Sequence, residues 1–228
     1  MKNLCIIPAR GGSKRIPRKN IKPFMGKHIM AYSIEAALKS GLFDEVMVST
    51  DDEEFAEVAK KYGASVPFLR SEATANDYAT TVDVLLEVVE MYKQRCKEFD
   101  TVCCLYSTAP FVSPERLSEA YGMLSDQIDG CFTIVEYSYP IQRSLRINDS
   151  GLVEMKYPEY LKSRTQDLEK VYHDAGQFYF VKKDVLCKEK TVWCKNTAPL
   201  VLSELEVQDL DTLTDWQLAE MKYELIHK

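Results

Sequence analysis

The residues best suited to chemistry lie near the N-terminus, in a loop that combines small residues with cations. Gly11, Gly12 and Ser13 leave backbone N–H groups open to a ligand, as such residues do in phosphate-binding loops. Cations packed closely together repel one another unless a polyanion lies between them, and a nucleoside triphosphate is such a polyanion. The cations of this basic loop, residues 10–19, are Arg10, Lys14, Arg15, Arg18 and Lys19.

A solvated charged surface and a nucleic-acid patch are the alternatives for the basic loop. The whole chain carries a formal net charge of -6, with a pI of about 5.3, whereas nucleic-acid binders are more often basic overall. The loop also follows an apolar run directly and is interrupted by glycine and proline, which favours a ligand loop. We expect no nucleic-acid partner, although the loop matches neither the P-loop nor the dinucleotide-binding glycine pattern.

A second candidate site is an acidic pair near the C-terminus, Asp209 and Asp211. In extended chain, residues two apart point to the same side, so both carboxylates would face one spot while Leu210 points into the core. Mg²⁺ favours one or two carboxylates together with phosphate oxygens, so the pair is a candidate magnesium site. The alternative is turn chemistry with capping of the next helix. We interpret the earlier acidic run, residues 51–54, as helix capping.

A third candidate is the polar cluster from Tyr172 to Gln177, just ahead of an apolar strand. His173 is one of three histidines, and a lone histidine is more often structural than catalytic. Its place beside Asp174 and Gln177 favours a loop that contacts substrate.

Periodicity predicts the elements that position these residues. A sheet formed by alternating strands and helices is mostly parallel and covered on both faces, which is a three-layer α/β fold. Ligands bind such sheets at the carboxyl ends of the strands, so the loops after Ile7, Ser49, Arg70 and Tyr106 should form one rim. The predicted strands are 4–7, 46–48, 66–70, 101–106, 131–137, 177–181 and 201–207. The predicted helices cover 27–40 and 52–62, a long segment from 80, a segment from 113, and a terminal segment. The terminal helix should bury Trp216, Ala219, Tyr223 and Ile226.

The alternation breaks between Ser138 and about Lys170. This excursion, residues 138–170, is rich in Tyr, Pro, Arg and Lys and has a turn at Asn148–Gly151. A loop this long within a compact domain is uncommon unless it is functional or pairs with something, and an ordinary surface hairpin is the alternative. With 228 residues, we expect a single domain, 1–228, that carries this excursion.

The remaining composition points to a cytoplasmic protein. Seven cysteines are scattered without a Cys-x-x-Cys pair, which is typical of buried thiols in a reducing compartment. No apolar run approaches the ~20 residues that span a bilayer, and the first residues lack the apolar segment of a secretory signal. We expect no membrane partner.

The segment from Pro8 to Ile21, PARGGSKRIPRKNI, closely resembles the signature of the cytidylyltransferases that activate nonulosonic acids. These are the CMP-sialic acid synthetases and their relatives for pseudaminic or legionaminic acid. The turn from Val48 to Asp52, Arg70 and the terminal acidic pair extend the resemblance over nearly the whole chain. It implies a Rossmann-like nucleotidyltransferase fold, and a homodimer in which the excursion exchanges between subunits and helps shape the sugar pocket.

The resemblance also implies the reaction and the residues that perform it. The anomeric hydroxyl of a sugar would attack the α-phosphorus of CTP and expel pyrophosphate, with Mg²⁺ held by Asp209 and Asp211. Arg10, Lys19 and Asp211 would be catalytic, and no residue stands out as a general base. The CTP-binding set would be Ala9, Arg10, Gly11, Ser13, Lys14, Lys19, Asn20 and Arg70.

The sugar pocket departs from the sialic acid enzymes. Their usual Gln-Pro-Thr-Ser-Pro is Tyr106-Ser107-Thr108-Ala109-Pro110 here, and the segment from Tyr172 to Tyr179 is more similar to the pseudaminic acid branch. We therefore predict pseudaminic acid as the sugar, with sialic or legionaminic acid as alternatives. A 3-deoxy-octulosonate enzyme and a nucleotide-binding module without catalysis are more distant ones. Predicted sugar contacts are Tyr106, Thr108, Tyr172, His173, Asp174 and Gln177.

Overall fold

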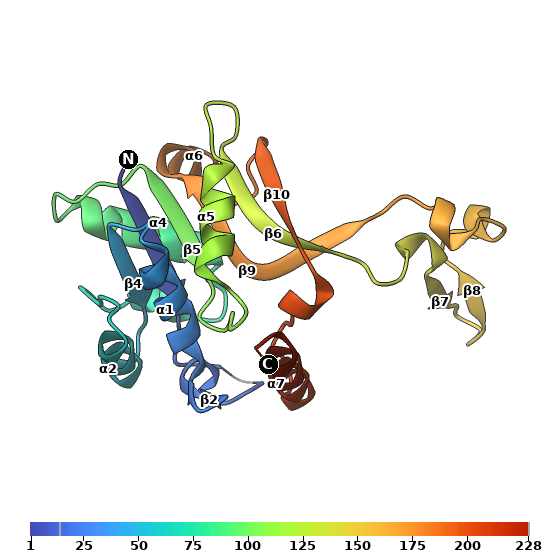
Figure 1. Ribbon diagram of the computed structural model, residues 1–228, viewed down its shortest axis with the longest axis horizontal. Coiled ribbons are helices and arrows are strands. Elements are labelled where there is room, and N and C mark those ends of the chain that lie inside the picture. Colours follow the sequence, from blue (N-terminus) through green and yellow to red (C-terminus); the bar gives the residue numbers. More distant parts are fainter. Residues whose placement is uncertain (14, 228) are drawn as a thin grey trace.

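The computed structural model describes residues 1–13 and 15–227, so Lys14 of the predicted CTP set lies outside the described residues. Within them, a six-stranded sheet has the order β10-β6-β9-β5-β1-β4 (Figure 1). β9 pairs antiparallel with both β5 and β6, and the other pairings are parallel. The strands are β1 Asn3–Pro8, β4 Glu45–Ser49, β5 Thr101–Leu105, β6 Gly130–Glu136, β9 Tyr172–Lys182 and β10 Thr197–Leu202.

Alternate residues of each strand enter two separate cores, one on each face of the sheet. Cys5 and Ile7 of β1 pack with α1, α2 and α5, whereas Leu4 and Ile6 pack with α4 and α6. This period-two partition confirms the predicted three-layer, mostly parallel arrangement. The helices are α1 Ile29–Ser40, α2 Glu53–Lys61, α3 Glu72–Ala75, α4 Thr81–Lys93, α5 Pro114–Gly122, α6 Lys183–Glu189 and α7 Leu213–Ile226.

A third core fixes the terminal helix α7 beside the basic loop. Trp216 packs edge-on against Phe24, which belongs to the small hairpin of β2 (Pro23–Phe24) and β3 (Lys27–His28). Leu210 is buried in the same cluster, as predicted. Thr212 caps α7, because its hydroxyl accepts from the Asp215 N–H. The Asp215 carboxylate accepts from the Thr212 N–H in return, and the two bonds form a capping box. This core therefore places the acidic pair against the basic loop.

Four predicted elements are wrong in detail. The polar cluster that we predicted as a loop ahead of the strand is the first part of β9, which begins at Tyr172. Residues 66–70 form no strand, because Pro67 lacks the N–H that a ladder needs and only Ser65 bridges to Met47 of β4. The predicted loop after Arg70 contains the short helix α3. The last strand ends at Leu202 rather than Val207, because Ser203 starts a capped 3-10 turn, η5 (Glu204–Glu206).

One side chain of α7 also differs from the prediction. Ile226, which we placed on the buried face, is 41% exposed, because it is the last residue of the helix. Trp216 and Ala219 are buried as predicted.

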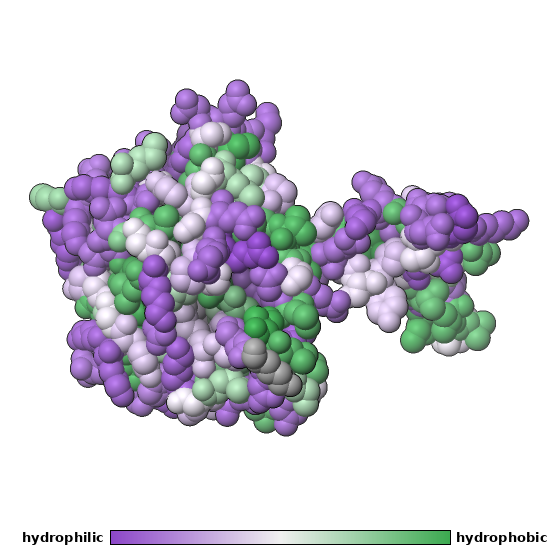
Figure 2. All heavy atoms as spheres, viewed as in Figure 1, coloured by the Kyte–Doolittle hydropathy of each residue, from purple (hydrophilic) through white to green (hydrophobic). Residues whose placement is uncertain are grey.

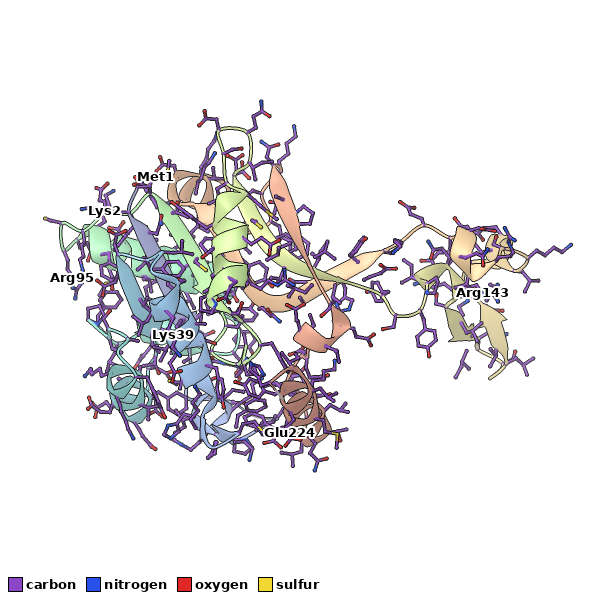
Figure 3. All side chains as sticks on the ribbon, viewed as in Figure 1. Met1, Lys2, Lys39, Arg95, Arg143 and Glu224 are labelled. Atoms are coloured by element: carbon purple, nitrogen blue, oxygen red, sulfur yellow. The ribbon has the colours of Figure 1, made fainter. Side chains whose placement is uncertain are left out.

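The excursion leaves the body as an arm (Figure 1). Its tip holds a hairpin of β7 (Leu145–Ile147) and β8 (Val153–Met155), followed by the short turns η3 (Pro158–Tyr160) and η4 (Thr165–Asp167). Arg143, labelled on the arm in Figure 3, donates to the carbonyls of Tyr160, Leu161 and Ser163 at 3.2–3.4 Å and so closes the tip on itself. Within the described residues, no helix is long and apolar enough to cross a membrane.

Candidate active site

A cleft of about 470 Å³ opens at the carboxyl ends of β1 and β5. The position agrees with the rule that parallel α/β sheets bind ligands at this edge. Most of the predicted polar residues meet here, although they come from distant segments of the chain. The predicted residues that line the cleft are Arg10, Ser13, Lys19, Asn20, Arg70, Tyr106 and Thr108.

The sequence-based prediction missed other residues that line the cleft. Arg15 lies inside the recognised signature, and Ser107 lies inside the segment that we compared with the sialic acid enzymes, so both had a signal. Thr80 and Thr81 stand at the start of α4, where Thr80 forms a capping box with Asp83. The only signal for these threonines was the cap itself, which is common to many helices.

Carboxylates of the protein partner the three arginines of the basic loop. Arg10 lies 2.6 Å from Asp77, and Arg15 forms an ion pair with Asp211. Arg18 reaches the first turn of α2, where Asp52 lies 3.5 Å and Glu54 2.5 Å from its guanidinium. The chain therefore supplies part of the negative charge that sequence reasoning assigned to a ligand alone. Exposed ion pairs of this kind contribute about 0–1 kcal/mol each, so a triphosphate competes with them easily.

The turn after β4 holds the glycine-rich part of the loop. The backbone N–H of Gly11 donates to the Asp51 carboxylate at 3.0 Å, and a Cβ at this glycine would lie 3.1 Å from Asp52 Oδ2. A larger residue here would therefore require the Asp52 side chain to shift by a few tenths of an ångström. Asp52 accepts from the N–H groups of Glu54 and Phe55, which confirms the capping interpretation of the acidic run.

Two buried polar residues brace the floor of the cleft. The Asn20 amide donates to the Arg10 carbonyl and accepts from the Ser107 hydroxyl, both at 2.9 Å. The Arg70 guanidinium donates to the Ser49 carbonyl at 2.6 Å and to its hydroxyl at 3.1 Å. Burial lowers the pKa of Arg70, and its side chain is fixed before any nucleotide arrives. Ala9 is fully buried and donates from its backbone to Ser49, so it offers backbone rather than side chain to the site.

Lys19 connects the basic loop to the acidic pair. Its amine donates to the Leu210 carbonyl at 2.8 Å and lies 4.0 Å from Asp211 Oδ1. Burial lowers the pKa of Lys19, and the nearby carboxylates of Asp211 and Asp209 oppose that shift. Asp211 therefore lies beside Lys19 at the mouth of the cleft, and the Asp209 carboxylate, two residues earlier, accepts from the Leu210 N–H at 2.8 Å. Two hard oxygen donors there fit a magnesium ion that also binds phosphate oxygens.

The predicted sugar contacts divide into two groups. Tyr106 and Thr108 line the cleft, and Asp174, His173 and Tyr172 lie at the start of β9, which reaches the same edge because β9 runs antiparallel.

Gln177 differs from both groups. Its side chain is buried and donates to the Glu206 carbonyl at 2.5 Å, so it ties β9 to η5. The structure therefore gives this amide a bracing role in place of the predicted sugar contact.

The geometry agrees with comparisons to known proteins. The family model described as cytidylyltransferase matches residues 4–208. The chain belongs to the cytidylyltransferase family. The chain is 46% identical to the pseudaminic acid cytidylyltransferase of Campylobacter jejuni, over 100% of this chain and 99% of that protein. It is 34% identical to the CMP-N,N'-diacetyllegionaminic acid synthase of Legionella pneumophila, over 99% and 97% of the two chains.

A solved structure shows the same fold for this cytidylyltransferase. A CMP:2-keto-3-deoxy-manno-octonic acid synthetase complexed with CTP superimposes with a TM-score of 0.70 at 20% identity, covering 100% of this chain and 99% of the other. The predicted family, fold class and enzyme class are therefore confirmed. The protein is a CTP-dependent nucleotidyltransferase.

Proposed function

We propose that this cytidylyltransferase transfers CMP from CTP to the anomeric hydroxyl of pseudaminic acid and releases pyrophosphate. The observation that carries the sugar assignment is the full-length identity of 45–46% to two enzymes named for pseudaminic acid. Identity to relatives named for legionaminic acid or acylneuraminate is 30–34%. Tyr106, in place of the glutamine of the sialic acid enzymes, supports the same choice.

In this proposal the chain acts by positioning and charge neutralisation, since no side chain serves as a covalent nucleophile. Arg10, Ser13 and Lys19 bind the triphosphate and offset the charge that develops on the leaving pyrophosphate. Asn20 and Arg70 hold the nucleoside end of the cleft. Asp209 and Asp211 hold Mg²⁺, which when bound polarises phosphate oxygens.

The sugar would lie between the cleft and the start of β9. Tyr106 and Thr108 face it from the cleft, and Tyr172, His173 and Asp174 face it from the strand. A cytoplasmic location is part of the proposal, since the seven free cysteines and the use of CTP suit a reducing compartment.

Pyrophosphate release with CTP and Mg²⁺ tests the sugar assignment. Pseudaminic, N-acetylneuraminic and legionaminic acids are offered in parallel at equal concentration, and we expect turnover with pseudaminic acid at least tenfold faster than with the other two. Faster turnover with either alternative would reassign the sugar and leave the reaction in place. CTP binding without turnover of any sugar would instead favour a non-catalytic module.

We also propose a homodimer formed through the arm. Apolar side chains gather at its tip and face solvent, which Figure 2 shows as green surface on the projecting segment. Ile147 is 75% exposed and its hairpin partner Val153 is 67% exposed. An exposed apolar patch on a projecting element is typical of a surface that another chain covers. The members of this apolar tip are Leu145, Ile147, Leu152, Val153 and Leu161.

Ile147→Glu should convert the dimer to a monomer. The dimer would bury the apolar tip, and a carboxylate at its centre would then lose its hydration. Light scattering coupled to gel filtration measures the mass directly. Leu38→Glu is the matched control, since Leu38 is an exposed apolar residue on α1 of the body, and it should remain dimeric. A monomeric wild-type protein, or an unchanged Ile147→Glu dimer, would contradict the assignment.

A further inference from the structure

A bulge interrupts β9 beside the cleft. Phe132 of β6 pairs with Tyr179, but Ile134, two residues on, pairs with Asp174. Thr133 therefore stands opposite the four residues 175–178, and Gly176 within them has a φ of +63°. Bulges re-aim side chains next to active sites, and a glycine admits the left-handed backbone that this one needs.

The bulge brings together two side chains that a regular strand would keep apart. Residues 174 and 179 are five positions apart, so in a straight strand they would point to opposite faces and lie about 17 Å apart. Here the Tyr179 hydroxyl donates to Asp174 Oδ2 at 2.5 Å. The other carboxylate oxygen accepts from the Gly176 N–H at 2.8 Å. Asp174 is thus held from two sides while remaining partly exposed at the rim.

Tyr179 also contacts the floor of the cleft. It is 4% exposed, and its ring lies 5.7 Å from that of Tyr106 and 5.6 Å from that of Phe132. The Tyr106 hydroxyl lies 3.4 Å from Thr81 Oγ1 at the start of α4. Burial raises the pKa of Tyr179, so its phenol stays protonated and serves as a donor. One buried tyrosine thus links the rim carboxylate to the aromatic residue that lines the cleft.

We propose that Tyr179 is a positioning residue for the acceptor sugar, acting through Asp174 and Tyr106. The inference rests on the proposed function. A fixed carboxylate accepts from hydroxyl or acylamino N–H groups and repels another carboxylate. Asp174 therefore faces the hydroxyl and acylamino part of the sugar, and the sugar's own carboxylate lies away from it. Tyr179 touches neither substrate.

Tyr179→Phe tests this role, because it keeps the ring and removes only the hydroxyl. We expect KM for the sugar to rise about tenfold, since a charge-assisted hydrogen bond no longer orients Asp174, while KM for CTP changes less than twofold. Asp174→Asn should give a similar rise. KM for the sugar should be little higher in the double variant than in either single variant, because both substitutions remove the same interaction.

Tyr92→Phe is the matched control, since Tyr92 is a buried tyrosine of α4 in the core on the same face as Tyr179 and does not line the cleft. It should leave both KM values unchanged. An equal rise in KM for CTP and for the sugar would overturn the role of Tyr179. An additive rise in KM for the sugar in the double variant would overturn it too. The measurements use whichever nonulosonic acid the wild-type enzyme turns over, so a wrong sugar assignment appears in the wild type and a wrong role for Tyr179 appears only in the variants.

Discussion

Asp211→Asn should lower kcat about 100-fold or more at saturating CTP, sugar and Mg²⁺. The substitution keeps the shape of the side chain but replaces a charged oxygen ligand with a neutral amide, and metal stabilisation of developing charge is worth several kcal/mol. Each 1.36 kcal/mol is tenfold in rate. Removing Mg²⁺ from the wild-type enzyme with a chelator should produce a comparable loss. Pyrophosphate release measures both.

The folded state should tolerate Asp211→Asn. Asp211 pairs with Arg15 and Lys19 at the cleft mouth, and partly exposed pairs contribute little to stability, so Tm should change by only a few degrees. Asp126→Asn is the matched control, because it makes the same charge change on the exposed turn between α5 and β6, at the opposite edge of the sheet. Near-normal turnover of Asp211→Asn in saturating Mg²⁺ would contradict the assignment of Asp211 as a magnesium ligand.

Lys19→Ala should lower kcat about 100-fold even when CTP saturates the enzyme. Removing a preorganised donor that is aimed at developing charge lowers kcat about 10²–10³-fold. Lys19 is half-buried and already fixed by the Leu210 carbonyl, so its amine needs no reorganisation as pyrophosphate leaves. Single-turnover rates at saturating CTP separate this effect from weaker nucleotide binding.

Two further variants define what Lys19 contributes. Lys19→Arg keeps the charge but not the compact geometry of the amine, and should recover only part of the rate. Lys60→Ala removes an exposed lysine of α2 that pairs with Glu57, and should leave the rate unchanged. An unchanged rate for Lys19→Ala at saturating CTP would contradict the proposed clamp on the triphosphate.

Local patterns determined most of the fold. The apolar run of β1, the periodicity of α1 and α4, and the cap at Asp52 depend on near neighbours in the chain, and each forms as predicted. Prediction failed where a local pattern met a distant constraint. Residues 66–70 look like a strand, but Pro67 prevents a ladder with β4. The last strand ends early because Ser203 and Glu206 cap each other.

The sequence by itself determined the family and part of the cleft, because the signature from Pro8 to Ile21 is continuous in the chain, and it determined the layers, because strands and helices alternate. Only the tertiary structure decided how those residues are partnered. Arg15 and Asp211 are 196 positions apart, and no periodicity relates them. The inward turn of Gln177 and the contact of Tyr179 with Asp174 likewise depend on the pairing of β6 with β9. Strand pairing is a long-range choice, and a bulge shifts every side chain that follows it.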